Sequence, residues 1–175
     1  MIIDLDGRSY VDPVSGKSYC VRHMTLQDVD QVVALEKRLS APPWSRASFL
    51  AELDERPYTL SLVAMDEQTL IGYMVVYFIF EEAHLANLAI APEYQHRGLG
   101  EHLLRLLIRI ARQTHRQILL LEVRRSNAKA IRLYEKMGFV HAGVRRKYYE
   151  DGEDALLMCK TLAEEKNLTA LVESD

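Results

Sequence analysis

A strand, a glycine-containing loop and a helix start follow one another between His84 and Gly100, and this order constrains the fold more than any other stretch. The apolar run through Ile90 is typical of a strand, and Pro92 ends it because proline has no N–H group for a sheet ladder. Gln-His-Arg-Gly-Leu-Gly, beginning at Gln95, then precedes a long amphipathic pattern. We expect the N–H groups at this helix start to form a site for an anion such as pyrophosphate, since glycine permits close approach.

The chain before this stretch predicts the antiparallel half of a sheet. A strand over 19–23 is followed by a helix that starts at the cap pair Thr25 and Asp28 and continues to Ser40. Ser45 is suited to cap a second helix, which ends by Pro57. The remaining elements are two hairpin strands over 59–65 and 70–80, and a segment over 1–18 whose turn signals indicate either a loose arm or a short hairpin.

The chain after the loop predicts two more helices and three more strands. Apolar residues lie along one stripe of 99–114, so this helix packs on the sheet. Residues 118–123 form an apolar run interrupted by Glu122, which is the pattern of a central strand buried on both faces and parallel to the strand before the helix. Ser126 or Asn127 caps the next helix. The helix stops at Gly138, strands follow over 139–144 and 155–160, and 163–175 form an extra helix or a disordered tail.

Size and composition favour one globular domain. The chain has 175 residues, 49% hydrophobic and 27% charged, and no apolar run approaches the roughly 20 residues that a membrane span needs. We expect a domain over 19–162, an N-terminal extension over 1–18 and a C-terminal tail over 163–175. The start of the chain lacks the basic and apolar segments of a secretory signal, so we expect a cytoplasmic protein with no membrane partner.

Net charge and cysteine spacing exclude several classes of function. The formal net charge of −3 gives no overall electrostatic reason to bind nucleic acid, although 145–147, Arg-Arg-Lys, form either a local basic patch or an ordinary solvated loop. Cys20 and Cys159 lack metal-ligand spacing, and we interpret them as reduced packing residues. We therefore expect no metal site. No Gly-Lys-Ser/Thr follows the glycines, which excludes a nucleotide-binding P-loop.

Three motifs resemble those of one enzyme family. Gln95-x-x-Gly-x-Gly after Leu-Ala-Ile-Ala-Pro resembles the acyl-CoA signature of the Gcn5-related N-acetyltransferase (GNAT) superfamily. Leu-Glu-Val-Arg-Arg-Ser-Asn from Leu121, with Ala-Ile-Arg-Leu-Tyr-Glu-Lys-Met-Gly-Phe from Ala130, looks like the later half of RimI-type N-terminal acetyltransferases, which include the ribosomal-protein-alanine enzymes. Arg-Arg-Lys-Tyr-Tyr at 145–149 and Glu-Asp-Ala at 153–155 continue the likeness, which covers roughly 21–162.

The resemblance implies an α/β GNAT fold that binds acetyl-CoA. Its sheet is mixed and mostly antiparallel, with seven strands flanked by helices and a central pair of strands that splay apart. The implied cofactor-binding residues lie on one splayed strand, in the loop after it and at a later helix start. They are Leu88, Ala89, Ile90, Gln95, His96, Arg97, Gly98, Leu99, Gly100 and Asn127.

The resemblance also implies two catalytic residues. Glu122 is the general base that takes a proton from the attacking amine, and Tyr134 is the general acid that protonates the departing thiolate. The residues alone leave structural alternatives open. Glu122 can instead form a salt bridge to an arginine such as Arg124, Tyr134 can be a core residue on an amphipathic face, and Asn127 can be only a helix cap.

Acceptor recognition is less readable from the sequence. By likeness to the family's loops, Trp44, Glu81, Tyr148 and Tyr149 border a groove for the first residues of a peptide, although Trp44 also suits a buried anchor for its Pro-Trp-Ser turn. The implied reaction is direct acetyl transfer in a ternary complex to a protein N-terminus, with ribosomal protein S18 as a candidate acceptor and partner. The alternatives are acetylation of lysine side chains or a small amine, and a non-catalytic acyl-CoA-binding module.

Overall fold

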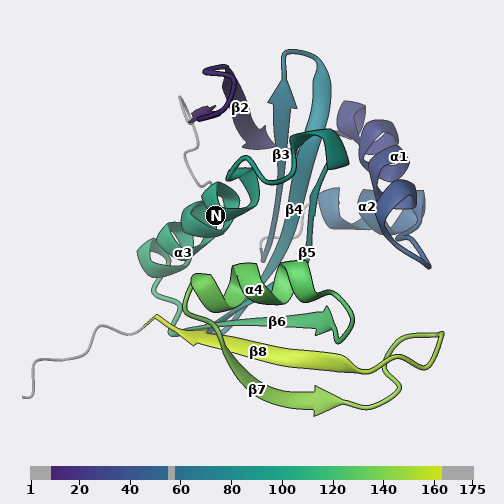
Figure 1. Cartoon of the computed structure of the whole chain (residues 1–175), viewed down its shortest axis with the longest axis vertical. Coiled ribbons are helices and arrows are strands. Elements are labelled where there is room, and N and C mark those ends of the chain that lie inside the picture. Colours follow the sequence, from purple (N-terminus) through teal and green to yellow (C-terminus); the bar gives the residue numbers. More distant parts are fainter. Residues whose placement is uncertain (1–8, 55–57, 163–175) are drawn as a thin grey trace, which may run out of the picture.

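The computed structural model describes residues 9–54 and 58–162, which form one eight-stranded sheet with helices on both faces (Figure 1). The strand order is β1-β2-β3-β4-β5-β6-β8-β7. All neighbouring pairs are antiparallel except β5 and β6, which are parallel and joined by the crossover helix α3. The strands are β1 (Ser9–Val11), β2 (Ser18–His23), β3 (Thr59–Asp66), β4 (Thr69–Ile79), β5 (Glu82–Ile90), β6 (Ile118–Arg124), β7 (Val140–Arg145) and β8 (Ala155–Thr161).

The helices begin where the sequence offers caps. Thr25 and Asp28 form the predicted capping box at the 3-10 turn η1 (Leu26–Asp28), which leads into α1 (Val29–Leu39). The Ser45 side chain accepts a hydrogen bond from the Ser48 N–H group at the start of α2 (Arg46–Leu53). The remaining helical elements are η2 (Pro92–Tyr94), α3 (Leu99–Gln113) and α4 (Ala128–Lys136).

Two apolar cores fill the space between the sheet and the helices. α1 and α2 cover one face and pack their apolar side chains around Phe49 and Tyr73. α3 and α4 cover the other face, where Leu103, Leu107 and Met74 are fully buried. Figure 1 shows α3 and the α1–α2 pair on opposite sides of β3, β4 and β5. No helix in the described ranges is long and apolar enough to cross a membrane.

The sheet opens between β5 and β6. Their parallel pairing runs only from Glu82 opposite Ile118 to Leu85 opposite Leu121. Beyond that point β5 stays paired with β4 as far as Ile90, and β6 stays paired with β8 to its end. A bulge lies in β5 at the same place, because Leu85 and Asn87 face consecutive residues of β4. The predicted splayed pair is therefore present, and β6, β8 and β7 turn away from β3–β5 (Figure 1).

Two sequence predictions about the sheet are wrong. The sheet has eight strands, not seven, because Ser9–Val11 pairs with β2 and the segment 9–18 is the hairpin rather than the loose arm. A three-residue strand is too short to show a period of two in the sequence. β6 is also not buried on both faces: Leu121 and Val123 are buried, whereas Glu122 is only half-buried. Pro57 and the tail 163–175 lie outside the described residues.

Candidate active site

The loop after β5 is hydrogen-bonded to the end of that strand and leads into the N-terminus of α3. The Gln95 Nε2 group donates a hydrogen bond of 3.0 Å to the Ile90 carbonyl oxygen, which ties the loop to the end of the splayed strand. Gly98 is the N-cap of α3 with a φ of 86°, a conformation that favours glycine. The N–H groups of the first helical turn have no partners within the helix. This part of the loop can therefore receive an anion, as the sequence predicts.

Close packing around the loop also favours glycine at positions 98 and 100, apart from any ligand. A Cβ atom on Gly98 would lie 2.8 Å from the Tyr10 hydroxyl oxygen, and one on Gly100 would lie 3.3 Å from Cδ2 of Leu133 in α4. The helix start is thus pressed between β1 and α4. The sequence prediction considered only the approach of a ligand.

The end of β5 offers main-chain groups to the opening in the sheet. Within the described residues, nothing in β6 pairs with β5 beyond Leu85. Leu88 and Ile90 point their side chains toward the core below α3 and α4, whereas Ala89 belongs to the core below α1 and α2. Along this stretch β5 still pairs with β4, and the Ile90 carbonyl oxygen accepts from Gln95, so the main-chain groups open to an extended ligand are the remaining ones on the edge of β5 that faces away from β4.

Tyr134 lies on α4, which begins beside the end of β6. The Asn127 side chain caps this helix by accepting a hydrogen bond of 3.2 Å from the Ala130 N–H group. The Tyr134 ring is buried and packs near Phe139, with ring centroids 5.8 Å apart. Burial raises the pKa of the Tyr134 hydroxyl, and the nearby Tyr149 adds to this shift. Across residues 9–54 and 58–162 this hydroxyl makes no hydrogen bond, so it is a protonated donor without a partner.

Glu122 is held by the end of β7 and by the β7–β8 loop. Its Oε1 atom lies 2.9 Å from Nη1 of Arg145, so Glu122 forms a salt bridge to an arginine, but this arginine is not Arg124. A hydrogen bond to Glu122 is also the main cause that raises the pKa of the Tyr148 hydroxyl. The Tyr148 ring meets Tyr149 edge-on at 5.2 Å, and Tyr149 lies near Tyr134. The structure therefore brings both predicted catalytic residues and both predicted loop tyrosines into one group.

Arg124 joins three segments at the mouth of the opening, and sequence reasoning missed this role. Its guanidinium donates to the Ala41 carbonyl oxygen at 2.7 Å, to Asp151 at 2.8 Å and to Glu153 at 2.9 Å. It also stacks over the Tyr149 ring, with Cζ 3.9 Å from the centroid. Hydrogen bonds from Ser126, with the Arg124 contact, lower the pKa of Glu153 to about 2, so the ion pair persists at neutral pH. One side chain thus fixes the turn after α1 against the β7–β8 loop.

Two predicted acceptor residues differ in position from the rest. Trp44 is half-buried and its ring packs on Phe49 with centroids 5.5 Å apart, while its main-chain N–H group donates to the Glu36 carboxylate, so Trp44 anchors its turn. Glu81 lies at the opposite end of β5 and β6, beside a surface hollow of about 710 Å³. Its neighbour Glu82 pairs with Ile118, four residues before Glu122, a separation of about 13 Å along a strand. Glu81 is therefore not brought together with the other residues.

Comparison with known proteins decides the family. The family model described as "Acetyltransferase (GNAT) family" matches residues 29–139. The chain belongs to the GNAT acetyltransferase family. The matched range includes α1, the loop after β5, Glu122 and Tyr134. Members of this GNAT family use acetyl-CoA as the acetyl donor.

Relatives of this GNAT chain include bacterial enzymes that modify a ribosomal protein. One relative is a Bacillus subtilis protein that is provisionally named as a ribosomal protein bS18-alanine N-acetyltransferase. It is 41% identical over 145 residues, covering 82% of this chain and 96% of that protein. A Salmonella typhimurium ribosomal protein bS18-alanine N-acetyltransferase is 38% identical over 138 residues, covering 77% and 92%. The crystal structure of the ribosomal-protein-S18-alanine N-acetyltransferase from Escherichia coli matches with a TM-score of 0.76 and 34% identity, covering 86% and 98%.

The described residues offer no metal site to this GNAT fold. No three histidine, cysteine, aspartate or glutamate side chains in the described ranges lie close enough together to hold an ion. Cys20 and Cys159 are free thiols on β2 and β8.

Proposed function

We propose that this chain transfers the acetyl group of acetyl-CoA to the N-terminal amine of a protein, and that the acceptor is the N-terminal alanine of ribosomal protein bS18. The observation that carries the proposal is that β5 and β6 separate after Leu85 and Leu121, between the α3 start and the Glu122–Tyr134 group. The relatives named for this activity support the choice of acceptor.

The donor lies along the end of β5. The pyrophosphate of acetyl-CoA binds the N–H groups from Gln95 to Gly100, because a helix start carries free donors and a positive dipole end. The pantetheine arm runs beside Leu88, Ala89 and Ile90 and replaces the missing β6 ladder. Asn127, at the start of α4, borders the same donor. With acetyl-CoA bound in this way, its thioester lies at the level of the β5 bulge.

The transfer needs one base, one acid and one donor to the oxyanion. The α-amino group has a pKa near 8 and is partly protonated at neutral pH, so Glu122 accepts its proton, directly or through water. The amine nitrogen then attacks the thioester carbonyl carbon, and a β5 N–H group stabilises the negative oxygen. When the carbon–sulfur bond breaks, the Tyr134 hydroxyl protonates the thiolate, and the second proton that the nitrogen loses returns the Tyr134 phenolate to its hydroxyl form. No acyl-enzyme forms, because neither cysteine belongs to the group.

The acceptor approaches over the β7–β8 loop. Tyr148 and Tyr149 border its path, and Trp44 supports the facing turn. The carboxylate of Glu122 suits an ammonium group at the end of a peptide. Lysine or small-amine acetylation is the second candidate, since GNAT donor sites are shared while acceptor loops differ.

A peptide panel tests the acceptor assignment. We expect the purified chain with acetyl-CoA to add one acetyl group to the α-amine of a peptide with the N-terminal sequence of bS18, as located by tandem mass spectrometry. The same peptide with a blocked N-terminus should remain unmodified even when it carries lysines. Acetylation of lysine in the blocked peptide, with none on the free N-terminus, would replace the proposal by the second candidate.

Arg124→Gln should weaken acceptor binding without weakening donor binding. The change removes the charged hydrogen bonds that hold the Ala41 turn against the β7–β8 loop. We expect the peptide KM to rise about tenfold, which corresponds to about 1.4 kcal/mol, with the Kd of acetyl-CoA within about twofold of wild type. Arg125→Gln is the matched control, because Arg125 is exposed and pairs only with Asp154 among the described residues. Equal peptide KM values in the two variants would contradict this role.

A further inference from the structure

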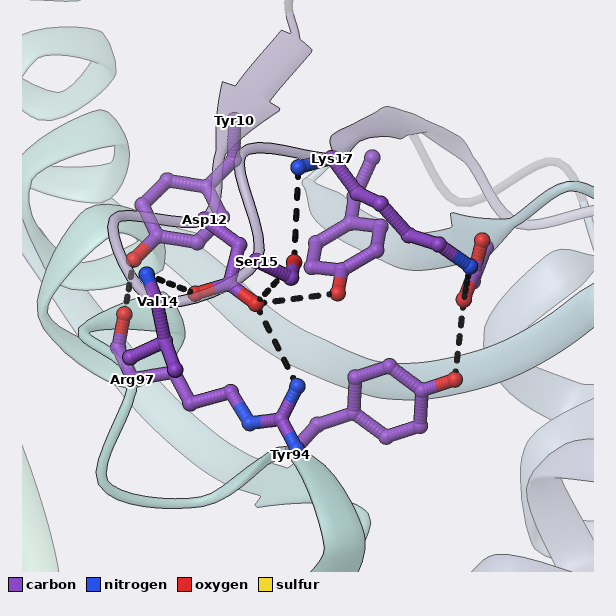
Figure 2. A network of polar contacts seen from close by, with 9 residues as sticks. Tyr10, Asp12, Val14, Ser15, Lys17, Tyr94 and Arg97 are labelled. Carbon is purple, nitrogen blue, oxygen red and sulfur yellow. Dashed lines mark hydrogen bonds and ion pairs between the residues drawn. The ribbon is translucent and has the colours of Figure 1, made fainter.

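The short strand β1 and the turn after it lie directly against the Gln95–Gly100 loop (Figure 2). The Tyr10 hydroxyl donates a hydrogen bond to the Arg97 carbonyl oxygen. The Tyr10 ring packs at a tilt against the His102 ring of α3, with centroids 4.9 Å apart, and its hydroxyl occupies the space where a side chain on Gly98 would lie. One tyrosine of the N-terminal segment therefore touches the loop, its glycine and the helix that follows.

Asp12 provides the second contact between the two segments. Its buried carboxylate accepts hydrogen bonds from the Ser15 hydroxyl at 2.6 Å, the Val14 N–H group at 2.9 Å and the Tyr19 hydroxyl at 3.2 Å. It also accepts one from Arg97 Nη1 at 3.3 Å. These contacts, with the Ser15 hydrogen bond the largest, lower the pKa of Asp12 to about 2, so the carboxylate stays ionised at neutral pH.

Arg97 is held from both sides as a result. Its guanidinium lies between the Asp12 carboxylate and the Tyr94 ring, with Cζ 5.4 Å from the ring centroid, and Figure 2 shows it turned toward Asp12. The Tyr94 hydroxyl is itself fixed by a hydrogen bond of 2.9 Å to Asp66 on β3. The side chain of Arg97 is thus used within the protein, and its main chain is tied by Tyr10.

We propose that Tyr10 and Asp12 are positioning residues for the donor site, which hold Arg97 and Gly98 so that the N–H groups of the loop stay aligned for the pyrophosphate of acetyl-CoA. The inference rests on the proposed function. The role of Tyr10 and Asp12 goes beyond that function, because the family model begins at residue 29 and does not include this hairpin. A loop with two positive φ angles, at His96 and Gly98, has few local constraints and gains from an external support.

Comparing acetyl-CoA with acetyl-pantetheine as donors distinguishes a role at the pyrophosphate site from general stabilisation of the fold. Acetyl-pantetheine carries the thioester but lacks the pyrophosphate, so its use does not depend on the loop. In Asp12→Asn, where the amide cannot accept all four hydrogen bonds, we expect the Kd and KM of acetyl-CoA to rise about tenfold. In Tyr10→Phe, which removes one hydroxyl, we expect a rise of about threefold to fivefold. In both variants, kcat/KM for acetyl-pantetheine and kcat at saturating acetyl-CoA should stay within twofold of wild type.

Asp28→Asn is the matched control. Asp28 is also a buried carboxylate, bound by two nitrogens of Arg22 at 2.7 and 2.8 Å, but it caps η1 through Thr25 and does not contact the loop. We expect it to lower the melting temperature without a selective loss of acetyl-CoA. Unchanged acetyl-CoA affinity in Asp12→Asn and Tyr10→Phe, or equal losses with both donors, would overturn the inference. Absence of acetyl-CoA binding by the wild-type chain in calorimetry would overturn the proposed function itself, and this inference with it.

Discussion

Tyr134→Phe is expected to lower kcat for acetyl transfer by about 100-fold or more, which is the lower end of what a positioned acid contributes. The substitution removes only the hydroxyl, and the ring keeps its packing near Phe139. Because this hydroxyl makes no hydrogen bond within the described residues, its loss breaks no structural contact. The Kd of acetyl-CoA and the melting temperature should therefore stay near their wild-type values. Steady-state kinetics at saturating donor and calorimetry provide the two measurements.

Tyr77→Phe serves as the control for this experiment. Tyr77 lies on β4 and its hydroxyl bonds Glu52 of α2 at 2.9 Å, outside the proposed site. Its removal should leave kcat within about twofold. If Tyr134→Phe and Tyr77→Phe had the same kcat as wild type, Tyr134 would be a core residue, the alternative that the sequence left open.

Glu122→Gln should have the second large effect, a fall of about 100-fold in kcat/KM for the peptide at neutral pH. The amide has the shape of the carboxylate but cannot take a proton from the ammonium group. The rate should then rise with pH as the acceptor loses its own proton, because an α-amino group has a pKa near 8. A pH–rate profile from pH 6 to 9 would measure this recovery.

The control for Glu122 is Glu135→Gln on α4. Glu135 is an exposed glutamate that pairs with His141 at 3.1 Å, so its charge is lost without a change at the opening. We expect a pH–rate profile like that of wild type. A Glu122→Gln profile that coincided with the wild-type one would remove Glu122 from the mechanism and leave its ion pair with Arg145 as a structural contact.

Much of the fold could be read from the sequence because local signals agree with the tertiary structure. The capping box at Thr25, the cap at Ser45 and the polar connection before Leu70 each coincide with an observed element. The order of strand, crossover helix and strand also predicted the parallel β5–β6 pair. The pattern could not decide between the β1 hairpin and a loose arm, since three residues carry no periodicity and the pairing of Tyr10 depends on Tyr19, nine residues later.

The candidate site was readable only in part, for a physical reason. The resemblance to family motifs proposed residues that each lie on a single local segment, such as Gln95 in the loop after β5, Glu122 on β6 and Tyr134 on α4. Contacts between distant loops carry no local signal. Arg124 bonds the Ala41 carbonyl 83 positions away, and the partner of Glu122 is Arg145 on another strand. The sequence also could not show that Glu81 lies apart from Glu122, because that distance depends on the register of β5 against β6.

A crystal structure of the chain with bound coenzyme A tests the central claim most directly. The account predicts the pantetheine arm between β5 and β6 beside Leu88–Ile90, the pyrophosphate on the N–H groups from Gln95 to Gly100, and the sulfur within reach of the Tyr134 hydroxyl. A structure in which β5 and β6 pair along their full lengths, or in which the coenzyme binds elsewhere, would contradict it.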